Sequence, residues 1–163
     1  MRALIQRVIK ANVKVDGKVI SEIDKGLLIF ICAMLHDDEK NVEKMASKIS
    51  KIRIFNDDNS KMNKSIIDIS GKALIVSQFT LSADTSRGNR PGFSSAANPE
   101  IGEKLYNNFI DYFGNLGIVC FSGIFGADMK VGLVNDGPIT VWLNNDNKTF
   151  WRFFRNFLTF SIY

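Results

Sequence analysis

The hydrophobic and polar positions at the start of the chain follow two different patterns. Over residues 3–23 apolar side chains alternate with polar ones, and the Asp16-Gly17 pair interrupts the alternation with a turn signal. Residues 26–35 then form a continuous apolar run, which is typical of a strand buried on both faces. These patterns predict a hairpin of two strands followed by a fully buried strand.

Two later segments have the spacing of amphipathic helices. Asp37 or Asp38 is placed to cap the first helix, because a carboxylate accepts hydrogen bonds from the first free amides. Asn98 and Pro99 begin the second helix, since Asn is a favoured cap and Pro fits the first helical position. The expected inner stripes are Val42, Met45, Ala46 and Ile49 in the first helix, and Ile101, Leu105, Phe109 and either Tyr112 or Phe113 in the second.

The rest of the chain predicts further strands around a polar loop. Residues 84–97 have loop composition, with Gly, Ser, Asn, Pro and two arginines. The expected strands are 52–55, 72–81, 118–125, 129–134 and 139–143. With hairpins early and late, about seven strands and two main helices indicate a single α+β domain with mainly antiparallel, barrel-like sheets.

The composition is that of a globular protein with a mild excess of positive charge. The 163 residues are 45% hydrophobic and 23% charged, and the formal net charge is +4 at pH 7. This excess fits a nucleic-acid or phosphate partner, although many proteins without such a partner share it. The sequence has no secretory start and no apolar run long enough to span a membrane, so we expect a cytoplasmic protein.

The chain offers few of the residues on which hydrolases and metal sites usually depend. Its two cysteines, Cys32 and Cys120, lie in apolar runs and are interpreted as small buried hydrophobes. Together with the one histidine, His36, they are too few for a four-ligand zinc site. His36 is also the only histidine that could serve a Ser or Cys nucleophile, and it begins the acidic stretch HDDEK, which predicts a solvated helix start. We therefore expect no metal, no cofactor and no catalytic histidine.

Polar residues interrupt the apolar strand predicted at 72–81. Ser77, Gln78 and Thr80 follow a run that is hydrophobic until then. On strict alternation Gln78 and Thr80 share one face of the strand, and Ser77 and Phe79 share the other. Two interpretations are open: the strand runs out to the surface, or its backbone N–H and hydroxyl groups form a pocket mouth that holds a carbonyl oxygen.

A second interruption falls between the last two predicted strands, in the stretch NDGPIT. Asp136-Gly137 is a typical two-residue hairpin signal. Pro138 follows at the first position of the next strand, where it removes a hydrogen-bond donor from the ladder. The pair Gly137-Pro138 is therefore either a stop between strands or part of a site.

The end of the chain differs in composition from the rest. Residues 147–163 contain no acidic side chain and many large apolar ones, several of them at helical spacing. The favoured interpretation is a helix packed on the body or on a second subunit. The alternative is an interfacial membrane helix with Arg152 and Arg155 at the lipid headgroups.

Several motifs, in order along the chain, together resemble the D-aminoacyl-tRNA deacylase (D-tyrosyl-tRNA deacylase) family. The two most specific are SQFTL at 77–81 and NDGPIT at 135–140. The pattern also includes the start MRALIQRV, RIF at 53–55, KMN at 61–63, ADTSRGNRPGFS at 83–94 and FGADM at 125–129. The resemblance covers residues 1–145. Residues 146–163 are then an aromatic C-terminal extension outside the family pattern, either an addition or the read-through of a stop.

The resemblance implies a homodimer whose site lies at the interface between the subunits. Gly137-Pro138, joined by a cis peptide bond, is expected to enter the partner's pocket, and Arg7 is expected to orient its carbonyl groups. The pocket residues implied are Ser77, Gln78, Phe79 and Thr80 as the catalytic set, with Phe125 and Met129 in substrate binding.

The activity implied by the resemblance is hydrolysis of the ester bond of D-aminoacyl-tRNA, which releases free D-amino acid and tRNA. A rigid backbone wall beside the substrate Cα would clash with an L side chain, so the D enantiomers and also glycine, mischarged on tRNA-Ala, are the expected substrates. The family's account has the vicinal 2′-OH of the RNA assist an oriented water. That account suits this sequence, because nothing near Thr80 would deprotonate its hydroxyl.

The substrate would need contacts beyond the aminoacyl group. Phe125 and Met129 are candidates for an apolar shelf under the terminal adenosine. The cations that could contact tRNA phosphates are Arg87, Arg90 and Lys130. We expect no membrane partner.

Two alternatives to this activity are kept open. One is a related aminoacyl-tRNA editing domain of other chirality, such as the editing module of archaeal threonyl-tRNA synthetase, against which the intact SQFTL and NDGPIT argue. The other is a non-catalytic module that binds tRNA or DNA regardless of acylation, suggested by the positive charge and the basic loop.

Overall fold

A long first strand organises the sheet of the computed structural model, which describes residues 1–145. This strand, β1 (Arg2–Val15), pairs antiparallel with β2 (Lys18–Ile23), β3 (Gly26–Cys32) and β8 (Lys130–Asn144). On the far side of β3, β6 (Lys72–Ser77) and β7 (Val119–Ser122) continue the sheet in parallel. The helix expected at 147–163 lies outside the described residues.

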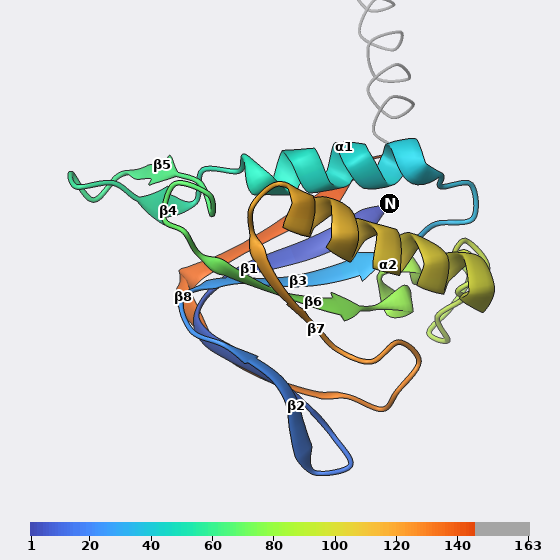
Figure 1. Cartoon of the computed structure of the whole chain (residues 1–163). Helices are drawn as coiled ribbons and strands as arrows, with labels where there is room; N and C mark the ends of the chain where they lie inside the picture. The colour runs from blue at the N-terminus through green and yellow to red at the C-terminus, as the bar shows by residue number, and fades with distance from the viewer. Residues whose placement is uncertain (146–163) are drawn as a thin grey trace, which may run out of the picture.

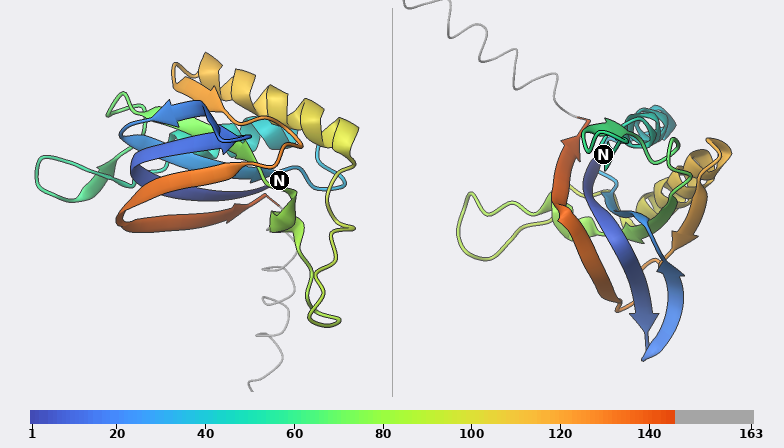
Figure 2. Two further views of the ribbon diagram at one scale, coloured as in Figure 1. Left: turned by 90° about the horizontal axis from the view of Figure 1, so that it is seen from below. Right: turned by 90° about the vertical axis from the view of Figure 1, so that its left-hand side faces the viewer.

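The sheet is mixed and curls into a nearly closed barrel, with the order β2-β1-β3-β6-β7 and β8 on the other edge of β1 (Figure 2). The helices α1 (Glu39–Ser50) and α2 (Pro99–Asn115) both lie on one side of it (Figure 1). A two-stranded ribbon of β4 (Phe55–Asn56) and β5 (Met62–Lys64) stands apart from the sheet. The predicted α+β class, single domain, barrel-like sheet and two main helices are confirmed.

The core has two parts because the central strand β3 is covered on both faces. Leu27, Ile29 and Ile31 face the helices and belong to the larger cluster. Leu28 points to the other face, where it joins the barrel interior with Val76 of the neighbouring strand β6. The prediction of a strand buried on both faces is confirmed, and the alternation of the pleat explains how one apolar run serves two cores.

Both helices begin where the sequence predicts. Asp38 caps α1 in a capping box with Asn41, and the predicted apolar stripe of α1 is buried. Asn98 caps α2, with its side chain accepting a hydrogen bond from the Ile101 amide at 2.9 Å. The prediction for the first turn of α2 is wrong, because Ile101 is 43% exposed. Gly102 takes the inward position there, close against the Phe125 ring.

Three predicted strands are shorter in the structure. The strand predicted at 72–81 ends at Ser77, because residues Phe79–Ser82 turn into the 3₁₀ helix η1. The stretch 52–55 contributes only the start of β4, and 118–125 contributes only β7. Since the chain bends after Ser77, the strand alternation expected for Gln78 and Thr80 does not hold.

The predicted late hairpin is wrong. Residues 129–134 and 139–143 belong to one strand, β8, and both halves pair with β1. The register passes from Val8 opposite Asn135 to Gln6 opposite Thr140, so residues 136–139 face Arg7 alone. The Gly137-Pro138 pair therefore stands out from β8 as a bulge, a device that bends a strand and re-aims its residues.

Candidate functional site

An apolar cavity of about 470 Å³ opens between the ends of β3 and β6 and the start of α2. Its volume falls in the range of about 300–1,000 Å³ that is typical of small-molecule sites. Five of the predicted site residues line it, namely Ser77, Gln78, Phe79, Phe125 and Met129. The structure thus brings together residues that lie about fifty positions apart in the sequence.

The turn η1 forms the mouth of this cavity. Phe79 is 60% exposed there and packs edge-on against Phe93, with 5.1 Å between the ring centroids. Thr80 does not line the cavity but lies beside it, where its Oγ1 accepts a hydrogen bond from Gln78 Nε2 at 2.5 Å. Within residues 1–145 the amides of Phe79 and Thr80 donate no hydrogen bond. Both remain available to a ligand, as is usual for the first N–H groups of a helical turn.

The inner wall of the cavity includes residues that sequence reasoning missed. Tyr106 is buried, and its hydroxyl donates to the Ile75 carbonyl at 2.8 Å. Burial raises the pKa of Tyr106 to about 12, so the phenol stays protonated at neutral pH. Its ring lies 5.9 Å from that of Phe125. The available signal was helical spacing, because Tyr106 lies between Leu105 and Phe109 on the inner face of α2.

The two cysteines are free thiols; Cys32 is buried, as the sequence predicts, whereas Cys120 is only half-buried. Cys32 lines the cavity, and burial raises its pKa to about 11. Burial likewise raises the pKa of Cys120 to about 11. Because a thiolate and not a thiol is the nucleophile, neither side chain is activated for catalysis at neutral pH. His36 is exposed in the turn before α1 and is not among the residues that line the cavity.

The Gly137-Pro138 turn is exposed and firmly held at its base. The Gly137-Pro138 bond is cis, and Gly137 has a φ of +117°. The Asn135 side chain closes the bulge by accepting from the Ile139 amide at 3.0 Å and donating to Thr140 Oγ1 at 2.9 Å. Gly137 and Pro138 themselves are exposed. The turn thus presents a backbone surface to the outside of the chain.

Arg7 supports this turn from below. It is only 7% exposed, and its Nη1 donates to the Ile54 carbonyl at 2.6 Å. Its Nε lies 2.9 Å from Asp136 Oδ2 in an ion pair, although Nε makes no hydrogen bond within the described residues. A Cβ on Gly137 would lie 3.2 Å from Arg7 Nη2, so the guanidinium packs directly against the turn. Arg7 thus bonds to the Ile54 carbonyl and pairs with Asp136, and its expected role toward the Gly-Pro carbonyls stays a prediction.

The turn does not lie in the cavity of its own chain. It faces Arg7, which pairs with Leu27 at the start of β3, whereas the cavity is lined by Ile31 and Cys32 at the end of that strand. Four residues of strand correspond to about 13 Å. The predicted site residues therefore fall into two separate groups, with Gly137, Pro138 and Arg7 outside the cavity.

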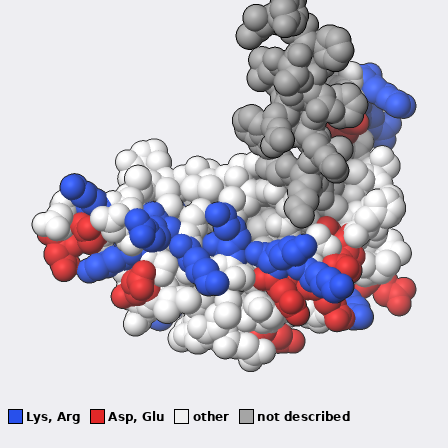
Figure 3. Space-filling view, turned by 90° about the horizontal axis from the view of Figure 1, so that it is seen from above, with Lys and Arg blue, Asp and Glu red and all other residues white. Residues whose placement is uncertain are grey.

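The surface charge is mixed. Lys and Arg side chains form a row across the face seen from above, with acidic side chains beside parts of it (Figure 3). Among the cations proposed for phosphate contacts, Lys130 is paired with Asp128 at 2.7 Å, whereas Arg87 and Arg90 are exposed and form no ion pair within residues 1–145. The loop that carries the two arginines projects from the body (Figure 2).

Residues 1–145 contain neither a metal-binding cluster nor a membrane-spanning helix. Residues 1–145 contain no cluster of three or more His, Cys, Asp or Glu side chains that could hold a metal ion. In the same part of the chain, none of the helices has the length and apolar character needed to cross a membrane.

Comparison with known proteins identifies the family. The sequence profile of the family described as D-Tyr-tRNA(Tyr) deacylase matches residues 4–144. The chain belongs to this family. A D-aminoacyl-tRNA deacylase from Jannaschia sp. (strain CCS1) is 57% identical over 144 residues, which are 88% of this chain and 98% of the relative. The family resemblance inferred from SQFTL and NDGPIT is thereby confirmed.

Solved structures share the fold. One, named c-Myc DNA Unwinding Element Binding Protein, has a TM-score of 0.85 at 38% identity and covers 88% of this chain and 98% of that chain. Another, named as a probable eukaryotic D-amino acid tRNA deacylase, has a TM-score of 0.75 at 16% identity and covers 87% of this chain and 97% of that chain. At that identity the second likeness supports the fold alone.

Proposed function

We propose that the protein is a hydrolase that cleaves the ester bond of D-aminoacyl-tRNA and releases free D-amino acid and tRNA. Family membership supports this proposal. The observation that carries it is that the chain has both an apolar cavity at Ser77, Gln78 and Phe79 and, apart from it, an exposed backbone turn at Gly137-Pro138. A site that works by shape and backbone groups suits a chain whose thiols are protonated and whose histidine is exposed.

We propose that two chains form a homodimer in which each turn enters the cavity of the other. The turn is about 13 Å along the sheet from its own cavity, so only a second copy could bring the two together. Within residues 1–145, β8 pairs with β1 alone, which leaves its other edge open. Its exposed apolar side chains include Trp142 at 48% and Val134 at 40%. Long open edges with apolar side chains are typical of association surfaces.

Chiral selection would follow from a clash. The Gly137 and Pro138 carbonyls would accept hydrogen bonds from the ammonium of the aminoacyl group and place its Cα beside a backbone wall. An L side chain would then collide with the wall, whereas a D side chain would point away from it. Glycine has no side chain, so glycyl groups mischarged on tRNA-Ala would also be cleaved. The firm base of the turn, formed by Asn135 and Arg7, suits such a wall.

Catalysis would rest on an oriented water and on donors for the oxyanion. The free amides of Phe79 and Thr80 are candidate donors, each worth about 3 kcal/mol of barrier when well placed. The vicinal 2′-OH of the substrate RNA would assist in activating the water. Phe125 and Met129 would support the terminal adenosine from the apolar side of the cavity.

One experiment tests the activity and its chirality. The protein is incubated with D-tyrosyl-tRNA and, in parallel, with L-tyrosyl-tRNA, and free tyrosine is measured over time. We expect rapid release from the D substrate and background release from the L substrate. Equal release from both would contradict chiral selection, and release from the L substrate alone would favour an editing domain of other chirality. Glycyl-tRNA-Ala is a third substrate on which release is expected.

A second candidate function is nucleic-acid binding without catalysis. It is favoured by one observation, the likeness at 38% identity to a structure whose name describes binding to a DNA unwinding element. This function predicts equal affinity for acylated and uncharged tRNA, binding to DNA, and no tyrosine release. The same preparation therefore separates the two functions, because only the hydrolase changes the acylation state of its ligand.

A further inference from the structure

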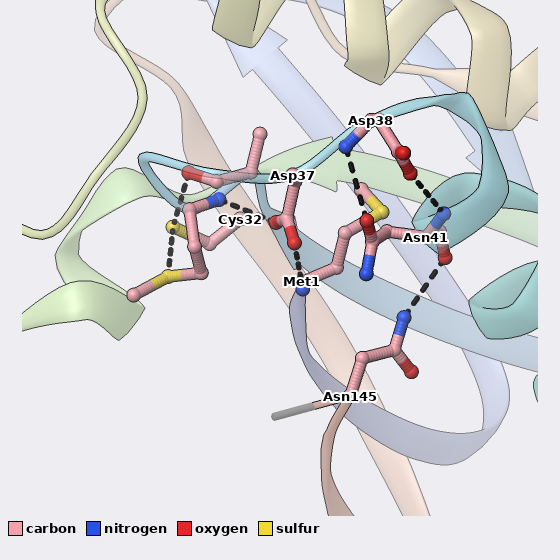
Figure 4. Close-up of polar contacts among 8 residues, drawn as sticks. Met1, Cys32, Asp37, Asp38, Asn41 and Asn145 are labelled. Atoms are coloured by element: carbon pink, nitrogen blue, oxygen red, sulfur yellow. Dashed lines mark hydrogen bonds and ion pairs between the residues drawn. The ribbon is translucent and has the colours of Figure 1, made fainter. Parts of the chain in front are cut away.

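Asp37 is a buried carboxylate that the proposed reaction does not use. Its side chain is only 3% exposed, and its Oδ1 accepts from the N-terminal ammonium of Met1 at 2.7 Å. Its Oδ2 accepts from the Met34 amide at 2.6 Å (Figure 4). The neighbouring Asp38 caps α1, so Asp37 is free of that task. A buried ion pair is weak evidence for stability, because desolvation offsets the Coulomb attraction.

Met1, the partner of Asp37, forms part of the cavity wall. Its side chain is fully buried in the larger core cluster and lines the cavity. Its carbonyl accepts from the Asn145 amide at 3.0 Å, and the Asn145 side chain donates to the Asn41 carbonyl at 2.8 Å (Figure 4). The Met1 carbonyl is thus bonded to Asn145, and the Met1 nitrogen is bonded to Asp37.

The other partner of Asp37 leads to a second part of the wall. Met34 forms an isolated bridge with Ala96, a residue that lines the cavity. On either side of it, the Leu35 amide donates to the Ser95 carbonyl at 2.9 Å, and the Ala97 amide donates to the Ala33 carbonyl at 3.0 Å. One carboxylate therefore ties the Met1 wall to the turn on which residues 95–97 rest.

We propose that Asp37 is a positioning residue of the cavity, and that the Met1 ammonium is the group through which it acts. The ion pair sets the spacing between Met1 and the part of the cavity wall formed by residues 95–97. This spacing determines how well the bound group fits the cavity. This inference rests on the proposed function for the nature of that group, the terminal aminoacyl-adenosine. Because Asp37 touches no reacting atom, its loss weakens substrate binding and leaves the chemical step intact.

The main test compares Asp37→Asn, which keeps the shape and removes the charge, with Asp38→Ala, which removes the neighbouring cap. We expect Asp37→Asn to raise KM for D-tyrosyl-tRNA about tenfold with kcat within about twofold, the pattern seen when substrate and transition state lose the same binding energy. Asp37→Glu restores the charge and should recover part of the KM. Asp38→Ala should lower the melting temperature and leave KM unchanged. An unchanged KM in folded Asp37→Asn, or an equal rise in Asp38→Ala, would overturn the proposal.

A chemical variant removes the positive charge without mutation. Protein that retains a formyl group on the Met1 nitrogen, verified by mass spectrometry, should show the same rise in KM as Asp37→Asn. Formylation of the Asp37→Asn variant should add little, because the two changes remove the two halves of one pair. Additive effects would show that the groups act independently and would contradict the proposal.

A readout independent of activity separates this inference from the proposed function. Amide hydrogen exchange at Met34, Leu35 and Ala97 should be faster in Asp37→Asn than in the wild-type protein, and unchanged in Asp38→Ala. A wild-type protein that releases no D-tyrosine contradicts the proposed function, and the exchange experiment still tests the positioning role of Asp37. An active wild-type protein with unchanged exchange in Asp37→Asn contradicts the positioning role of Asp37 alone.

Discussion

At the scale of single residues, Thr80 lies near the proposed site, but no neighbouring group activates its hydroxyl as a nucleophile. Its hydroxyl lies beside the cavity and accepts a hydrogen bond from Gln78 Nε2, an amide that donates and cannot remove a proton. We predict that Thr80→Ala retains activity within about tenfold of the wild type, since the loss is one neutral hydrogen bond. Single-turnover release of D-tyrosine measures it. A loss of many orders of magnitude would indicate a covalent threonine.

Gly137 is the residue at which backbone conformation matters most for the proposed site. Its φ of +117° strains any L side chain, and a Cβ would lie 2.8 Å from Ile139 Cγ1. We predict that Gly137→Ala lowers the free energy of unfolding by about 1–3 kcal/mol and abolishes D-specific release, because the turn must move. Thermal melting and the paired D and L assays measure the two effects.

Gly17 supplies the matched control for this substitution. It also has a positive φ, +75°, but a Cβ there meets nothing within 4 Å. Gly17→Ala should therefore cost backbone strain in the β1–β2 turn and leave deacylation unchanged. A similar loss of activity in both variants would show that stability, and not the turn at Gly137, governs the assay.

At the scale of elements, the loop between η1 and α2 joins the cavity to the surface. It begins with the bridge between Asp84 and Gly92, and Phe93 follows directly at the cavity mouth. Its two arginines, Arg87 and Arg90, lie between these points and are free of ion pairs within the described residues. A phosphate backbone that leads into the cavity would pass this loop.

Charge removal in this loop is predicted to weaken tRNA binding in a salt-dependent way. The double variant Arg87→Ala and Arg90→Ala should reduce the slope of log affinity against log salt by about 1.5, if each arginine neutralises one phosphate. Titration of uncharged tRNA over a range of salt concentrations measures the slope. Lys130→Ala is the control, because Asp128 already neutralises this cation, and it should change the slope little.

The strand β8 shows why element boundaries depend on pairing. The local sequence Asp136-Gly137 signals a hairpin, yet both halves of the strand pair with the same partner, β1. A hairpin would require the halves to pair with each other, and that choice is made by residues more than a hundred positions away. The result is a bulge in which Gly137 and Pro138 project out of the sheet.

At the scale of the whole molecule, the proposed dimer gives a direct prediction. Trp142→Asp should convert a dimer into folded monomers and remove D-tyrosyl-tRNA hydrolysis, because a charge would be buried in the interface and the two halves of the site would separate. Sedimentation and the release assay measure both outcomes. Val119, on the opposite edge of the sheet, is 56% exposed, and Val119→Asp should leave both unchanged. A monomeric but active Trp142→Asp variant would contradict the cross-subunit site.

The extent of the functional unit gives a second prediction at this scale. We propose that residues 1–145 form the deacylase unit and that 146–163 is an extension, since the family match ends at residue 144. Removal of residues 147–163 should therefore leave melting temperature and activity unchanged. A fall in either would assign the extension a contact with the body, with a second subunit or with the cavity.

The sequence by itself determined the features that depend on neighbouring residues. The buried strand β3, the caps at Asp38 and Asn98, and most of the helix stripes follow from local periodicity and capping chemistry. The motifs SQFTL and NDGPIT also pointed to the family, and the motifs SQFTL and FGADM contain the five predicted residues that line the cavity. These features are local, so they can be read without knowing which segments meet.

The tertiary structure decided what depends on distant segments meeting. It ended β6 at Ser77, joined the two halves of β8, and placed Met1, Phe93 and Tyr106 around one cavity. It also separated the Gly137-Pro138 turn from that cavity by the length of half a strand. The physical reason is that strand pairing and cavity formation depend on the burial and hydrogen bonding of the whole chain. A local sequence pattern does not contain that information.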